Sequence, residues 1–205
     1  MNKTLFEELD PLIPVDFFNI EVEGTIGKEF SLPDTSDLLG ESSFADFSMK
    51  LTKEALKLKV DIRKPFEESL YPEYEKGDSL ELFIDTRDLK TAGFMTRFCH
   101  QFLILPVEVQ GITSREITRF RTEDVHPLCD PADLEVKAHF HSGRYSLEIE
   151  IPEHCLHGYD PASFSRLGFT YRVNRPEGNP QHFSLSSRLY NIVQHPSLWA
   201  TIDFS

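Results

Sequence analysis

The stretch Lys53–Lys64, KEALKLKVDIRK, alternates between apolar and charged residues along most of its length. Lysine, aspartate and arginine fill the positions between the apolar side chains, which are Leu56, Leu58, Val60 and Ile62. Successive side chains of a β-strand point to opposite faces, so this period of two is typical of a strand with one buried face. The segment therefore predicts a half-buried strand at the surface of an apolar core.

Further strands are expected on both sides of this segment, separated by turn residues. We predict them near residues 17–22, 44–51, 80–84, 98–105, 117–121, 134–151, 167–173, 183–187 and 198–204. Residues 24–41 are expected to form a long loop, Pro106 to end the strand before it, and residues 141–144 to turn a hairpin. Short strands with almost no helical periodicity predict an all-β, antiparallel sandwich of the immunoglobulin-like or jelly-roll type.

The length and the first residues of the chain predict one domain with an N-terminal arm. The 205 residues suit one sandwich, which we place at 16–205, preceded by a short helix or arm at 1–15 that begins with capping-box spacing at Thr4 and Glu7. Acidic residues stand where a signal peptide needs an apolar run, and the odd cysteine count suggests no paired framework. We expect a cytoplasmic protein, with signal-independent secretion left open.

The charge balance argues against two classes of partner. The chain has 21 Lys and Arg against 34 Asp and Glu, a formal net charge of -13. Such a surplus repels phosphate backbones and anionic lipid headgroups. We therefore expect no binding to nucleic acid or to membranes.

Four stretches resemble the family-nine carbohydrate-binding-module superfamily, a DOMON-related group of β-sandwiches. They are GDSLELFIDTRD at 77–88, YSLEIEIP at 145–152 with Leu156, LGFTYRVN at 167–174 and PSLWAT at 196–201. Their order and spacing match over roughly residues 16–204. The resemblance implies the sandwich fold more strongly than it implies a ligand.

The resemblance also implies ligand-binding side chains that can be sought in this sequence. Sugar-binding members would have two tryptophans that clamp a sugar between them, whereas this chain has only Trp199, read as core packing or as a single platform. Haem-binding members would use Met with His or Lys. Met49 and Met95 are the internal methionines here, and apolar packing is the competing interpretation for both.

The densest polar segment of the sequence, residues 116–127, supplies most of the candidate ligand-binding residues. Two arginines two positions apart on a strand would share a face and could grip a carboxylate. The competing interpretation is that both arginines pair with the neighbouring acids, and that the histidine of the preceding strand is a core residue. The candidates are His100, Arg119, Arg121, Glu123, Asp124 and His126.

Metal binding remains an alternative at two places in the sequence. The segments 126–129 (HPLC) and 154–157 (HCLH) offer histidine and cysteine donors, although their spacing fits a structural zinc site poorly. No cofactor is expected, but loop carboxylates could hold a structural calcium ion without forming a contiguous calcium loop. These are Asp85, Asp88, Asp124, Asp130 and Asp133.

Taken together, these features predict a non-enzymatic binding module for a carbohydrate or another polar or anionic small ligand. The first alternative is a protein-interaction domain without a small ligand, and the second is a haem- or metal-binding member of the same superfamily. An enzyme comes last, because the sequence has no nucleophile elbow, no phosphate-binding glycine loop and no recognisable Cys–His motif. Cys99 and His100 are adjacent on a strand and so point to opposite faces.

Overall fold

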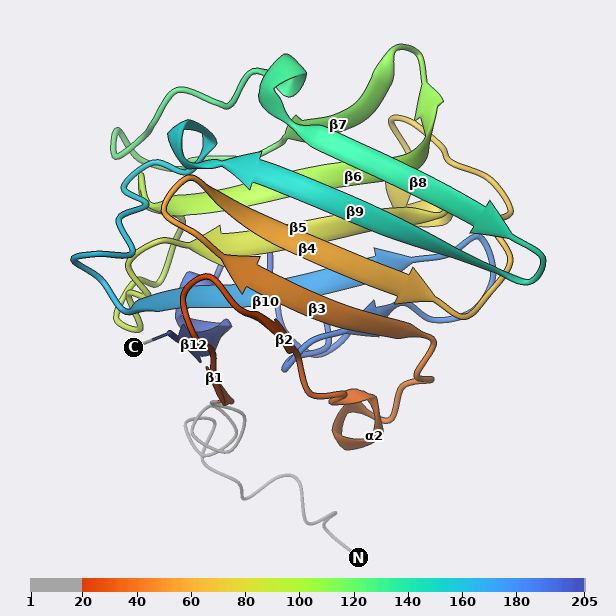
Figure 1. Cartoon of the computed structure of the whole chain (residues 1–205), viewed down its shortest axis with the longest axis horizontal. Helices are drawn as coiled ribbons and strands as arrows, with labels where there is room; N and C mark the ends of the chain where they lie inside the picture. Colours follow the sequence, from red (N-terminus) through yellow and green to blue (C-terminus); the bar gives the residue numbers. More distant parts are fainter. Residues whose placement is uncertain (1–19, 205) are drawn as a thin grey trace, which may run out of the picture.

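Two β-sheets pack face to face in the computed structural model, which describes residues 20–204 (Figure 1). The five-stranded sheet has the order β2-β3-β4-β9-β8, and the seven-stranded sheet has the order β1-β12-β10-β5-β6-β7, with β11 paired to β10. All pairings are antiparallel except that of β1 with β12. The predicted antiparallel β-sandwich is therefore confirmed.

The strands follow the alternation seen in the sequence. The five-stranded sheet is formed by β2 (Glu29–Ser31), β3 (Ala45–Leu51), β4 (Ala55–Ile62), β8 (Glu135–His141) and β9 (Arg144–Pro152). The seven-stranded sheet is formed by β1 (Glu21–Glu23), β5 (Ser79–Asp85), β6 (Cys99–Val109), β7 (Ile112–Glu116), β10 (Arg166–Asn174), β11 (Gln181–His182) and β12 (Ala200–Asp203). The alternating stretch at 53–64 forms β4, which pairs with β3 on one side and β9 on the other.

The main core lies between the two sheets. It takes alternate residues of both, such as Leu58 and Val60 from β4, Leu82 from β5 and Tyr171 from β10, whose ring stacks on Phe47 at 3.6 Å. A second apolar cluster covers the other face of the seven-stranded sheet and contains Phe83, Met95, Cys99, Leu185, Ile192 and Trp199. Strands β5 and β6 thus have covered residues on both faces.

Between residues 20 and 204, helical structure is confined to single turns. Helix α2 spans Ser36–Leu39, and 3-10 turns occur at Tyr74–Lys76, Pro131–Asp133, Glu153–Cys155 and Pro196–Leu198. No helix within residues 20–204 has the length and apolar character needed to cross a membrane. The predicted N-terminal arm at 1–15 lies outside the described residues.

Several predicted boundaries are wrong. Pro106 does not end β6, because the register shifts between Ile104 and Val109, and such an irregularity accommodates a residue without an N–H. The strand expected at 117–121 is absent, because the backbone pairing ends with the bond from the Ile117 N–H to the Gln101 carbonyl (2.7 Å), and the Gln101 N–H donates to the Thr118 hydroxyl (2.8 Å) instead of to a carbonyl. The expected loop at 24–41 contains β2 and α2, and β11 lies at 181–182 instead of 183–187.

Candidate functional site

A polar recess lies on the outer face of the seven-stranded sheet, opposite the main core. Side chains alternate along the strands, so Leu82, Phe102 and Tyr171 enter the core while Glu81, Gln101 and Arg172 point the other way. Arg172 stands directly across from Glu81 in the pairing of β10 with β5. The floor of the recess is therefore built on the strands at the middle of the sheet.

Hydrogen bonds hold this floor rigid. The Glu81 carboxylate is fully buried and accepts from Gln101 Nε2 (2.9 Å), Arg172 Nε (2.7 Å) and Asn174 Nδ2 (3.0 Å). Burial would lower the pKa of Arg172, but Glu81 and Glu75 raise it above its usual value. Burying a carboxylate is costly unless it is paired and hydrogen-bonded, so the floor depends on these contacts.

The rim includes a charged side chain whose hydrogen-bonding capacity is not used by any of residues 20–204. Arg119 is exposed and forms no salt bridge or hydrogen bond with residues 20–204. The Gln194 side chain also lines the recess, but its Oε1 is covered by protein and has no hydrogen-bond partner within the same residues. Burial, together with Glu81 and Glu75, raises the pKa of Tyr74 to about 12, so its phenol is neutral.

The recess has a volume of about 390 Å³, within the usual range for small-ligand pockets. It is lined by Pro72, Glu73, Tyr74, Glu75, Lys76, Gln101, Ile117, Arg119, Arg172, Val193 and Gln194.

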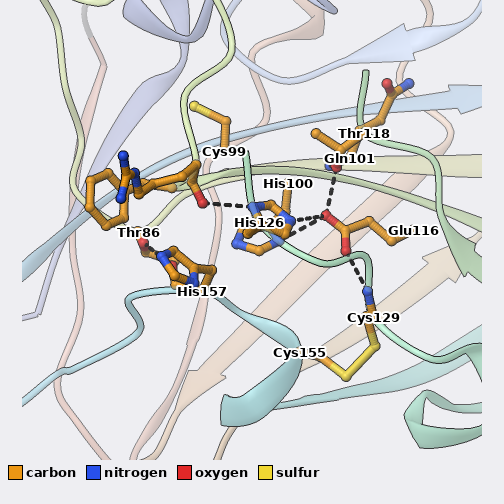
Figure 2. A network of polar contacts seen from close by, with 12 residues as sticks. Thr86, Cys99, His100, Gln101, Glu116, Thr118, His126, Cys129, Cys155 and His157 are labelled. Carbon is orange, nitrogen blue, oxygen red and sulfur yellow. Dashed lines mark hydrogen bonds and ion pairs between the residues drawn. A yellow bond between two sulfur atoms is a disulfide. The ribbon is translucent and has the colours of Figure 1, made fainter. Parts of the chain in front are cut away.

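A second polar cluster, made of His100, Glu116 and His126, is buried on the inner side of β6 (Figure 2). Glu116 Oε1 lies 2.9 Å from His100 Nδ1 and 2.8 Å from His126 Nε2. Burial would raise the pKa of Glu116, but hydrogen bonds from His100, His126 and Thr118 lower it to about 2. We call these three residues the His–Glu–His cluster.

The six residues predicted as a binding site lie in three different places. His100 and His126 are in the His–Glu–His cluster, and Arg119 lines the recess on the opposite face of the sheet. Asp124 pairs with Arg97 at the surface instead of with a nearby arginine. Arg121 and Glu123 are exposed, with no salt bridge to any described residue. The structure therefore does not bring His100, Arg119 and Arg121 into one pocket.

Solved structures with a similar fold bind or are described as binding carbohydrate. A carbohydrate binding module family 9 from Caldicellulosiruptor kristjanssonii in complex with cellotriose has 15% identity and a TM-score of 0.62, over 90% of this chain and 93% of that chain. Its complex with glucose gives 14% identity and a TM-score of 0.61, over 90% and 95%. A proposed carbohydrate-binding protein from Bacteroides uniformis gives 8% and 0.56, over 91% and 98%.

The chain has the family-nine carbohydrate-binding-module fold. This confirms the resemblance found in the four sequence stretches. No model of a known protein family matches the chain, and no curated protein matches it in sequence.

Within the family-nine fold, the single tryptophan is a core residue. Trp199 is 1% exposed, donates from Nε1 to the Ile192 carbonyl (2.8 Å) and packs against Phe83. It cannot serve as a sugar platform without leaving the second apolar cluster. Met49 and Met95 are also fully buried among apolar side chains, as the packing interpretation expected.

Two of the three cysteines form a disulfide, so the expectation that none is paired is wrong. Cys129 and Cys155 are bonded to each other, and Cys99 is a buried free thiol. The fold brings the HPLC and HCLH segments side by side, and the rings of His126 and His157 stack at 5.7 Å (Figure 2). In the disulfide, however, neither sulfur is a thiolate that could bind zinc.

The five aspartates considered for calcium are each engaged by protein groups. Asp85 accepts backbone N–H groups of its own turn, Asp88 pairs with Lys90, and Asp124 pairs with Arg97. Asp130 caps the turn at 131–133, and Asp133 Oδ2 lies 3.1 Å from His154. They do not converge on a common point.

Sequence reasoning missed the floor of the recess, although a signal was present. Glu81 is the only charged residue within the apolar run 80–84, and Arg172 is the only one within 167–173. A charge inside a strand that is covered on both faces must find a partner. Two such strands therefore predict a buried pair, and with it a polar site, wherever they are neighbours.

Proposed function

We propose that the protein is a binding module for a carbohydrate and that the sugar lies in the recess above Glu81 and Arg172. The observation that supports this most is the rim, where the exposed Arg119 has no partner among residues 20–204 while the floor beneath it is fixed. Structures with the same fold hold cellotriose and glucose, which makes a gluco-configured sugar the first probe.

The chemistry of the rim suits a polyhydroxylated ligand. Sugar hydroxyls both donate and accept hydrogen bonds, so they need acceptors such as the exposed Glu75 carboxylate as well as donors such as the Arg119 guanidinium. The neutral Tyr74 side chain adds an aromatic face and a hydroxyl. Because the strands hold the floor in place, little ordering is required when a ligand binds.

Paired arginine variants test the proposal. Isothermal titration of the wild-type chain with glucose, cellobiose and cellotriose should detect binding of at least one of them. Arg119→Ala removes the free guanidinium from the rim and should weaken that binding roughly tenfold or more, the usual effect of losing a charge-assisted hydrogen bond. Arg121→Ala is the matched control, because Arg121 is exposed and does not line the recess.

Two results would contradict the proposal. One is that the chain binds none of a wider panel of sugars, although the equal melting temperatures of the wild type and both variants show that they are folded. The other is an equal loss of affinity in the Arg119 and Arg121 variants, which would place the ligand outside the recess.

A further inference from the structure

The His–Glu–His cluster lies on the opposite side of β6 from the recess, and the proposed sugar site makes no use of it. His100 stacks on Phe102 toward the core, whereas its neighbour Gln101 points to the recess. The side chains of His100 and Glu116 are fully buried, and that of His126 is 1% exposed. Histidine and glutamate are common metal ligands, and three such side chains that converge on one buried point require a chemical explanation.

One oxygen of Glu116, Oε1, faces three hydrogen-bonding groups, which is more than its two lone-pair sites can accept from. Oε2 accepts the Cys129 N–H (2.8 Å), and Oε1 accepts the Thr118 hydroxyl (2.6 Å). A carboxylate oxygen has about two lone-pair sites, so one site of Oε1 remains. Both His100 Nδ1 and His126 Nε2 are directed at it. One proton can satisfy one of these nitrogens, whereas a bound cation can contact both.

The hydrogen bonds of His126 also indicate a positive charge between this residue and Glu116. Its Nδ1 faces the Arg97 carbonyl oxygen at 2.6 Å, so Nδ1 must carry a proton and donate. A neutral ring then has a lone pair on Nε2, which faces the Glu116 carboxylate at 2.8 Å (Figure 2). Two lone pairs at this distance repel each other unless a positive charge lies between them. That charge is either a further proton on His126 or a metal ion.

We propose that His100 Nδ1, Glu116 Oε1 and His126 Nε2 bind a divalent transition-metal ion of the zinc class. Two imidazoles and one carboxylate are a common ligand set for zinc. The three ligand atoms lie within 4.8 Å of one another. A tetrahedral ion lies about 2.0–2.1 Å from each ligand atom and holds the ligand atoms about 3.3 Å apart. The ion therefore fits if Glu116 Oε1 moves about 0.5 Å farther from the two nitrogens, which now lie 2.9 and 2.8 Å from it.

The surroundings of the cluster match those of metal ligands in proteins. A ligating histidine usually donates its other N–H to a carbonyl, as His126 does to Arg97, and a ligating carboxylate is itself hydrogen-bonded, as Glu116 is by Thr118 and Cys129.

Zinc titration of the full chain tests the site. Protein stripped with EDTA and dialysed should bind one equivalent of added zinc, and its melting temperature should rise by about 5 °C or more in excess zinc. Cobalt should give the visible absorption of a tetrahedral ion and be displaced by zinc. If the wild-type chain binds no stoichiometric zinc, His126 carries the extra proton instead and the proposal is overturned.

Three variants show where the metal binds. Glu116→Gln keeps a hydrogen-bond acceptor for Thr118 but loses the charge, and it should abolish zinc binding. His154→Ala removes the exposed donors near Asp133 and should leave zinc binding unchanged. If His154→Ala abolishes binding, the metal is at the surface and the proposal fails. Arg119→Ala should bind zinc normally, which separates this test from that of the sugar site.

One measurement does not depend on a folded variant. The imidazole nitrogen NMR signals of the wild-type chain should show zinc-dependent shifts at His100 Nδ1 and His126 Nε2. Unchanged signals at both nitrogens, in the presence of one equivalent of zinc, would exclude them as ligands. This result decides the question even if Glu116→Gln does not fold.

Discussion

Glu81 on β5 and Glu116 on β7 are both buried carboxylates of one sheet, in which β6 lies between these two strands, yet their partners differ in kind. Glu81 is surrounded by groups that always carry protons, the amides of Gln101 and Asn174 and the guanidinium of Arg172. Glu116 faces two imidazoles whose protonation depends on their surroundings. The contacts of Glu81 therefore keep the floor of the recess rigid. In the His–Glu–His cluster, a metal ion can take the place of a proton.

Thiol counting tests the cysteine assignments at the residue scale. Cys99 is fully buried, and burial raises its pKa to about 12, so the native protein should not react with Ellman's reagent. Protein purified without reductant and then denatured should expose one thiol, because Cys129 and Cys155 are bonded. Reduction before denaturation should raise the count to three. Three thiols in the unreduced, denatured protein would exclude the disulfide.

At the scale of elements, the contact between the segment after α2 and β11 depends on one buried acid. Glu41 Oε1 lies 2.8 Å from His182 Nδ1, and Oε2 accepts the His182 N–H (2.9 Å). The other nitrogen of His182 contacts the Ser187 hydroxyl (2.8 Å), and Arg188 lies 3.6 Å from Glu41. These contacts connect a loop of one sheet to the shortest strand of the other.

We expect Glu41 to contribute to acid denaturation. Burial would raise its pKa, but the contacts with His182 and Ser186 lower it below the usual 4.5. On acidification the unfolded chain therefore takes up this proton first. The ionised group stabilises the fold at pH values above 4.5, and its contribution is lost as the pH falls through the folded-state pKa.

Glu41→Gln tests this pH dependence. The variant should be less stable by roughly 2 kcal/mol at pH 7, because charged hydrogen bonds are lost. The difference from wild type should shrink as the pH falls below 4.5. Urea unfolding at a series of pH values measures it, with the exposed Glu108→Gln as control. A difference that stays constant with pH would show that Glu41 keeps its ordinary pKa.

On the scale of the whole molecule, the two apolar clusters share strands. Leu82 and Phe102 belong to the core between the sheets, and Phe83 and Cys99 belong to the cluster around Trp199. These four residues lie on β5 and β6, and neither cluster can lose its packing without disturbing those strands.

Unfolding should therefore be a single transition. Trp199 is the only tryptophan, so its fluorescence reports the second cluster, while far-UV circular dichroism reports both sheets. Urea curves from the two probes should have the same midpoint. A fluorescence midpoint at clearly lower urea would mean that the segment around Trp199 unfolds before the sandwich does.

Much of the architecture could be predicted from the sequence because alternation is a local property. The pattern at 53–64 locates β4 and its buried face, and the turn at 141–144 locates the hairpin of β8 and β9. The candidate site could be predicted less well from the sequence. Arg119 and Arg121 are two residues apart and were expected to share a strand face, but β7 ends at Glu116 and the following residues take an irregular path.

The sequence by itself determined that this chain is an acidic antiparallel sandwich. It also determined which residues of most strands face the core, because buried and exposed side chains alternate along a strand and the pattern can be seen in neighbouring residues. Only the tertiary structure decided that Tyr74, Gln101, Arg119 and Arg172 surround one recess, that His100 meets Glu116 and His126, and that Cys129 reaches Cys155. These groups come from separate segments. Their meeting depends on strand order and register, which are fixed by contacts between residues far apart in the chain.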